Sequence, residues 1–188
     1  MVGRSNVGKS SLINALIRGR LARTSAAPGK TRLINLYRVT LGHGTPRLLV
    51  DLPGYGYARG GRSAAAEFEH LTATYFARAE DAGHVSALLL VDSRHPGLDS
   101  DRAAWRWLQR VVEHPAVVAT KIDKLARGQR IRAVRDLESA FEDAVLPVST
   151  VTGEGLDELW KLIDRLANSP RAHLPSPPKA TARRPPRK

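Results

Sequence analysis

The sequence contains no cysteine, which excludes both a disulfide framework and a thiolate metal site. It also has no apolar run of 18 or more residues, and it does not begin with the charged and then apolar segments of a secretion signal. Together these absences predict a cytoplasmic protein without a membrane span or a membrane partner.

Acidic residues are scarce, with 18 Asp and Glu against 30 Lys and Arg, which gives a formal net charge of +12. An excess of this size predicts an anionic partner. Residues 168–188 hold six basic residues, no acid and six of the twelve prolines. Such a segment cannot bury enough apolar surface to offset the entropy of ordering it. We therefore expect one domain over residues 1–167 and a disordered basic tail after it.

The first residues carry the strongest motif in the chain. Residues 3–10 read G-x-x-x-x-G-K-S, the pattern of a phosphate-binding P-loop. In that loop backbone N–H groups surround the phosphates, Lys9 reaches the terminal pair and the Ser10 hydroxyl binds Mg²⁺. Residues 12–17 are apolar at helical spacing, so the loop leads into a helix whose N-terminus favours an anion. A single match to this pattern also arises by chance, so the other motifs of the chain decide whether residues 3–10 bind phosphate.

Apolar patterning predicts that strands and helices alternate along the remaining chain. Residues 18–32 form a long loop, and the turn at residues 42–46 makes the first two strands that follow it an antiparallel hairpin. The order predicts an open α/β sheet, mixed but mostly parallel, with helices on both faces. The expected strands are 33–41, 47–50, 87–91, 116–119 and 145–148, and the expected helices are 63–76, 99–112 with Asp99 or Ser100 as N-cap, 129–142 and 156–167.

Polar residues follow three separate apolar strands, at Asp51, Asp123 and Ser149. Ligands of open α/β sheets bind beyond the carboxyl ends of the strands, so these side chains should gather beside the P-loop. Asp51 can hold the water shell of Mg²⁺, and the N–H of Gly54 can reach a γ-phosphate. Asp123 can accept two hydrogen bonds from guanine, from N1–H and from the 2-amino group. Adenine has neither donor, so Asp123 favours guanine.

Three further groups complete this hypothesis. Thr31 can bind Mg²⁺ only if its loop folds over the nucleotide, which makes the loop sensitive to the γ-phosphate. The aliphatic stem of Lys121 can lie along the base, and backbone after Ser149 can donate to the base oxygen.

Each residue also has an ordinary structural interpretation. Asp51 alone could form a turn before Pro53, Asp123 could be a helix cap or a surface acid, and Thr31 could be a plain loop residue. Ser149 and Thr150 could belong to the N-cap region of the last helix. Their shared position at strand ends argues against coincidence.

Four segments, GRSNVGKSSLINAL, APGKTRLINLY, DLPGYGYA and TKIDKL, together resemble the EngB (YihA/YsxC-type) family of bacterial GTPases. That family lies within the translation-factor class of P-loop GTPases. The resemblance covers residues 3–167, and DLPGYGYA is its most specific part. It implies a Ras-like P-loop GTPase fold for residues 1–167, an EngB-type G domain.

The resemblance also implies a function. Family members bind GTP and GDP with Mg²⁺, hydrolyse GTP slowly, act in assembly of the large ribosomal subunit and are needed for normal cell division and septation. The implied partners are the large-subunit precursor and its rRNA, and we expect a monomer. By position, the nucleotide contacts would be Gly3, Arg4, Ser5, Asn6, Val7, Gly8, Lys9, Ser10, Gly29, Lys30, Thr31, Arg32, Leu33, Asp51, Leu52, Pro53, Gly54, Thr120, Lys121, Ile122, Asp123, Val148, Ser149 and Thr150.

The expected metal ligands are Ser10, Thr31 and Asp51, and the expected catalytic groups are Lys9, Asn6, Thr31 and Gly54. Tyr55 stands where Ras-like enzymes place a water-orienting Gln, which predicts slow intrinsic turnover. Asn6 offers a substitute, because related GTPases with Asn here hold K⁺ near the β- and γ-phosphates. The alternative is that Asn6 only shapes the loop. Thr120 replaces the usual Asn, which we expect to weaken a hydrogen bond that braces the loop.

Two other functions compete with a GTPase switch. Tyr55 is compatible with a guanine-nucleotide-dependent binding module that barely hydrolyses GTP. The P-loop alone also fits an ATPase or kinase, against which Asp123 argues. Basic residues at 62, 127, 130, 132 and 135 are candidates for RNA contact, or equally an ordinary solvated face.

The start of the chain departs from the family pattern. A P-loop follows a strand that enters the sheet centre, yet only Met1 and Val2 precede Gly3. Either the chain is a shortened start of a longer protein, or a central strand is missing and its neighbours have unpaired edges. We favour the first interpretation, with a truncated first strand.

Overall fold

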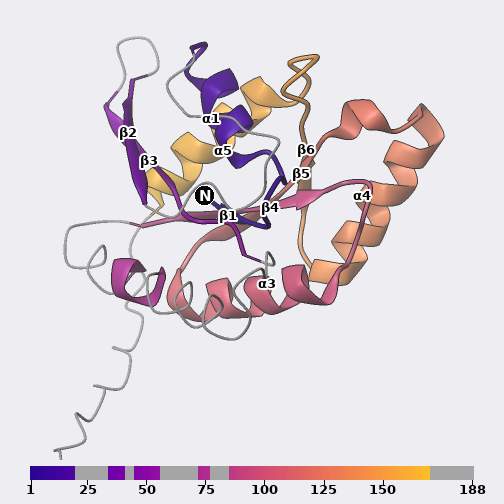
Figure 1. Cartoon of the computed structure of the whole chain (residues 1–188), viewed down its shortest axis with the longest axis horizontal. Helices are drawn as coiled ribbons and strands as arrows, with labels where there is room; N and C mark the ends of the chain where they lie inside the picture. Colours follow the sequence, from indigo (N-terminus) through magenta and orange to yellow (C-terminus); the bar gives the residue numbers. More distant parts are fainter. Residues whose placement is uncertain (20–33, 41–44, 56–71, 77–84, 170–188) are drawn as a thin grey trace, which may run out of the picture.

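The computed structural model describes residues 1–19, 34–40, 45–55, 72–76 and 85–169. Strands and helices alternate through these residues as the apolar patterning predicts (Figure 1). The elements are β1 (Val2–Gly3), α1 (Lys9–Leu16), β2 (Asn35–Val39), β3 (Arg47–Asp51), β4 (Ala87–Asp92), α3 (Asp99–Val111), β5 (Pro115–Thr120), the 3₁₀ turn η1 (Ile122–Lys124), α4 (Arg127–Phe141), β6 (Val145–Pro147) and α5 (Leu156–Asn168).

The main sheet contains four parallel strands in the order β1-β4-β5-β6. The expected first strand is present as two residues, which pair with Leu89 and Leu90 of β4. The hairpin of β2 and β3 forms its own antiparallel ladder, with Tyr37 opposite Leu49. It lies beside β1, because the Met1 amino group donates to the Val50 carbonyl at 2.5 Å and the Leu52 N–H donates to the Met1 carbonyl at 3.2 Å.

Helices cover both faces of the parallel sheet, which confirms the predicted layers. Alternate residues of a strand point to opposite faces. Leu88 and Leu90 of β4 belong to the buried cluster that includes residues of α1 and α5. Leu89 and Val91 belong to the cluster formed with α3 and α4. All six residues of β4 are buried, as expected for a strand at the centre of such a sheet.

Helix starts differ from the prediction in two places. Neither Asp99 nor Ser100 is the N-cap of α3; the N-cap is Leu98, which makes no side-chain cap, and Asp99 is the first helical residue. Its carboxylate there still complements the helix dipole. Helix α4 begins two residues earlier than predicted, because the Gln129 side chain accepts a hydrogen bond from the Ala126 N–H at 3.0 Å and extends the first turn.

Several predicted segments cannot be compared with the structure. The long loop at 18–32, residues 63–71 of the predicted second helix and the predicted tail beyond Ser169 lie wholly or mostly outside the described residues. Residues 72–76 are helical, as predicted for that helix.

Gly153 and Gly155 provide a matched test of backbone geometry before α5. Both have positive φ, 82° and 77°, but a Cβ at Gly155 would collide with the Pro147 carbonyl, whereas none of the described atoms lies within 4 Å of one at Gly153. We expect Gly153→Ala to lower the free energy of unfolding by about 1–2 kcal/mol through φ strain alone. Gly155→Ala should lower it distinctly more. Urea unfolding measures both, and equal losses would contradict the collision.

Candidate functional site

The P-loop closes around the ammonium group of Lys9. Lys9 Nζ donates to the carbonyls of Gly3 at 3.1 Å and Arg4 at 3.3 Å, and the side chain is buried. Burial lowers the pKa of the Lys9 ammonium, and the nearby Asp51 carboxylate opposes that shift. Gly8, with φ 108°, precedes α1 without a side-chain cap, so the first amides of the helix remain available to an anion.

Ser10 and Asp51 meet beside this loop, as predicted. Ser10 Oγ donates to Asp51 Oδ2 at 3.0 Å, and Asp51 is 1% exposed at the end of β3. Asp51 Oδ1 is buried and has no hydrogen-bond partner among the described residues. A hydroxyl beside an unsatisfied carboxylate oxygen fits Mg²⁺, which keeps several waters and binds few protein carboxylates. The described residues contain no cluster of three or more His, Cys, Asp or Glu that would suit another metal.

Gly54 brings the loop after β3 against the P-loop. A Cβ on Gly54 would lie 2.7 Å from the Ser5 backbone nitrogen and 2.8 Å from Ser5 Oγ, so only glycine fits here. The Ser5 N–H also donates to the Tyr55 carbonyl at 3.0 Å. Any group bound at the phosphate loop therefore lies next to this second loop.

Thr120 braces the P-loop, so a hydrogen bond to the loop is present with threonine at this position. Its hydroxyl lies 2.7 Å from the Val7 carbonyl and 3.1 Å from the Val91 carbonyl. The side chain is buried at the end of β5, where β4 lies on one side and the P-loop above it. The shorter threonine reaches the loop because Val7 lies directly against the end of the strand.

Lys121 joins the P-loop to the end of β4. Its Nζ donates to the Asn6 carbonyl at 2.5 Å and to Asp92 Oδ2 at 2.9 Å. Arg94 donates to both oxygens of the same carboxylate, from Nε to Oδ1 at 2.9 Å and from Nη2 to Oδ2 at 2.7 Å. Burial opposes ionisation of Asp92, but hydrogen bonds and charge from Arg94 and Lys121 prevail and hold its pKa well below the usual range.

Asp123 and Ser149, which were both predicted at strand ends, contact each other. Ser149 Oγ donates to Asp123 Oδ1 at 2.8 Å, which holds that carboxylate at the turn η1 after β5. Burial opposes ionisation of Asp123, but hydrogen bonds from Ser149, its own backbone and Lys124 lower its pKa. Ser149 is not the N-cap of α5, which is Gly155. Its hydroxyl instead accepts from the backbone of residues 151 and 152 and so shapes the turn before the helix.

A buried acid on α3 contacts both phosphate-side loops. Asp101 is 1% exposed; its Oδ1 accepts from the Tyr55 hydroxyl at 2.9 Å and lies 3.3 Å from Arg4 Nε. Burial, with the charge of Asp101, raises the pKa of the Tyr55 phenol far above its usual value, so it remains a donor. The side chain in the position of the water-orienting Gln is thus held by α3.

Sequence reasoning missed Asp92, Arg94 and Asp101. Asp92 ends an apolar strand just as the other predicted acids do, and this was a signal that could have revealed it. Asp101 gave no signal beyond an acid on the buried side of an amphipathic helix. Of the predicted contacts, residues 29–33, including Thr31, lie outside the described residues.

Comparison with known proteins decides the family. A family model described as 50S ribosome-binding GTPase matches residues 1–121. The probable GTP-binding protein EngB of Lachnospira eligens is 44% identical over 167 residues, which is 86% of this chain and 76% of that relative. The chain belongs to the EngB family of GTP-binding proteins.

Solved structures agree on the fold. A crystal structure of a probable GTP-binding protein EngB has a TM-score of 0.67 and 22% identity to this chain, covering 88% of it and 96% of that chain. Era, solved with MgGDPNP and a segment of 16S ribosomal RNA, has a TM-score of 0.75 at 21% identity, covering 93% of this chain and 57% of its own. The resemblance to EngB, the Ras-like fold and the identification as a GTPase are therefore confirmed.

The described helices of this EngB-family chain are all too short or too polar to cross a membrane.

The ion-pair cluster at Asp92 predicts a pH-dependent stability. Because the pKa of Asp92 is lower in the folded protein, its contribution is complete above about pH 4 and disappears as the pH falls below that value. Asp92→Asn should cost about 1.5–3 kcal/mol of unfolding free energy at pH 7. The variant should lose less stability than the parent between about pH 4 and pH 2.

Urea unfolding across this pH range measures the effect. Asp136→Asn, which changes an exposed carboxylate on α4, is the matched control and should follow the parent chain. If the parent and Asp92→Asn lose the same unfolding free energy between about pH 4 and pH 2, the interpretation is contradicted.

Proposed function

We propose that this EngB-family chain is a Mg²⁺-dependent GTP switch that acts as a cytoplasmic monomer in assembly of the large ribosomal subunit. The observation that carries the proposal is the contact between Gly54 and Ser5. It puts the loop after β3 beside the P-loop, where a γ-phosphate would touch both loops and GDP would touch one. Such a difference is what a nucleotide-dependent switch requires.

The metal and phosphate groups follow from the same geometry. Lys9 and the amides of the loop would offset the charge of the phosphates. Ser10 and Asp51 would hold Mg²⁺, which would supply further positive charge against the charge that develops during hydrolysis. Thr31 is proposed as a further Mg²⁺ ligand from the long loop. Gly54 donates its N–H to the γ-phosphate.

Guanine selection is assigned to the far end of the same site. Asp123, held by Ser149, accepts hydrogen bonds from N1–H and the 2-amino group of the base. The stem of Lys121 lies along the ring while its ammonium is fixed by Asp92 and the Asn6 carbonyl. A base lacking those donors would leave a carboxylate unpaired, which disfavours adenine.

Ribosomal RNA is the proposed macromolecular partner. The formal charge of +12 suits an RNA surface, and the matching family model is described as ribosome-binding. The basic tail would add to that attraction. A requirement for normal cell division and septation is proposed as a consequence of this role or alongside it.

Tyr55 favours a second candidate, a guanine-nucleotide-dependent binding module with negligible hydrolysis. Its phenol donates a hydrogen bond to Asp101 and cannot orient water as a Gln side chain does.

If the chain is instead a GTPase switch, its turnover would depend on another positive charge near the phosphates. We assign that position to K⁺ held by Asn6.

Potassium should therefore accelerate phosphate release at least about tenfold over sodium, a small part of what an arginine finger supplies. Asn6→Gly should remove the difference. Asn6 has φ 64°, which glycine adopts without strain, and the backbone carbonyl that receives Lys121 is retained. Phosphate release from GTP is measured in KCl and in NaCl, with and without ribosomal subunits.

Equal rates in the two salts would refute potassium activation. If phosphate release is absent under every condition while GTP still binds, the binding module is the correct function.

Sedimentation with purified ribosomal subunits tests the partner. The chain should bind large subunits at least about fivefold more tightly with a non-hydrolysable GTP analogue than with GDP, and binding should weaken as salt rises. Small subunits are the control. Equal binding to both subunits, or to neither at low salt, would overturn the assignment to the large subunit.

A further inference from the structure

Helix α3 has one side that the core fixes. Trp105 and Leu108 are buried, and the Trp105 indole N–H donates to the Phe141 carbonyl of α4 at 3.0 Å. Asp101 on the same side contacts Tyr55 and Arg4. These contacts determine the rotation of α3 about its axis, so its outer side is presented in one orientation.

The outer side of α3 carries a row of arginines. Arg102, Arg106 and Arg110 are exposed and lie four residues apart. The Cα atoms of neighbouring arginines in the row are about 6 Å apart along the helix axis, so the three together span about 12 Å. From Arg102 to Arg110 the other exposed residues are Ala103 and Gln109, so this stretch presents no exposed acid.

This row is not neutralised within the described structure. The ion pairs of the described residues include none of these three arginines. Arg102 Nε donates to the Gly97 carbonyl at 3.0 Å, which orients the side chain while the rest of its guanidinium group remains free to bind. Like charges four residues apart destabilise a helix, so the row carries a small energetic cost without a structural return.

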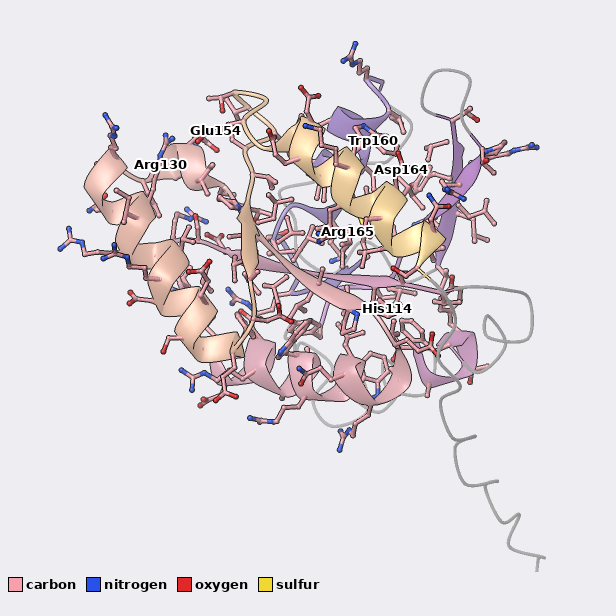
Figure 2. All side chains as sticks on the ribbon, turned by 180° about the vertical axis from the view of Figure 1, so that it is seen from behind. His114, Arg130, Glu154, Trp160, Asp164 and Arg165 are labelled. Carbon is pink, nitrogen blue, oxygen red and sulfur yellow. The ribbon has the colours of Figure 1, made fainter. Side chains whose placement is uncertain are left out.

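The arginines of α4 differ in their surroundings. Arg130 pairs with Glu154 at 2.9 Å, and Figure 2 shows the two residues side by side near the N-terminal end of α4. Arg132 has Asp136 four residues later, and Arg135 has Glu138 three residues later, spacings at which opposite charges attract along a helix. Helix α4 therefore has acids among its arginines. On α3 the acids at these spacings, Asp99 and Glu113, lie only before and after the row, and Arg106 has none.

We propose that the row formed by Arg102, Arg106 and Arg110 docks on the backbone phosphates of RNA. This inference rests on the proposed function and assigns its RNA contact to one helix. Guanidinium groups bind phosphate through paired hydrogen bonds, and the step between neighbouring arginines is comparable to that between successive phosphates. The row includes no exposed large apolar side chain of the kind that centres a protein interface or enters a membrane.

The experiment measures binding of a fluorescently labelled RNA stem-loop by anisotropy. The full chain is used with Mg²⁺ and a GTP analogue between about 50 and 200 mM salt. Replacing all three α3 arginines with glutamine should weaken binding at least about tenfold and lower the slope of log K against log salt by about 3.

A charge-matched variant separates a docking surface from general attraction. Arg127, Arg132 and Arg135 of α4 are also exposed, and their replacement by glutamine removes the same charge. That variant should keep most of the affinity and slope. Unchanged GDP affinity and melting temperature show that both variants are folded and retain the nucleotide site.

Each failure points to a different error. If the parent chain binds RNA and the α3 variant binds equally well, or if both variants lose the same affinity, the α3 surface is wrong while an RNA partner stands. If the parent chain binds no RNA at low salt, the RNA partner in the proposed function fails as well.

Discussion

The position of the P-loop depends on how the end of β5 holds it. Thr120 connects the loop to β4 through the carbonyls of Val7 and Val91, and Lys121 connects it to Asp92 through its ammonium. Two neighbouring residues thus fix one loop to the central strand of the sheet. Because Asp123 follows Lys121 by two residues, the same backbone also fixes the distance between the P-loop and Asp123.

Helix α3 connects that site with the surface on its far side. Its inner carboxylate, Asp101, touches the P-loop through Arg4 and the loop after β3 through Tyr55. Its outer arginines lie one residue, five residues and nine residues further on in the same rigid helix. A shift of Tyr55 with the bound nucleotide would change the contacts of Asp101. A partner on the arginine row would therefore bind the helix whose inner side contacts both loops of the candidate site.

The sequence predicts the fold and the central acids for an identifiable reason. Parallel strands end at one edge, so Asp123 and Ser149 could be grouped from strand order alone. Asp51 ends the hairpin strand β3, which lies beside β1. The pairings Ser10 with Asp51 and Asp123 with Ser149 follow once those elements are adjacent. The order of strands and helices along the chain is therefore enough to predict these pairings.

Pairings that depend on the rotation of a helix or the path of a loop could not be predicted in this way. Asp101 meets Tyr55 only because the core fixes the rotation of α3 and Gly54 allows two loops to approach within van der Waals contact. Likewise Thr120 reaches Val7 because of the position of the loop, a distance that propensities and periodicity do not encode. Local patterns specify which residues face inward, whereas tertiary packing selects their partners.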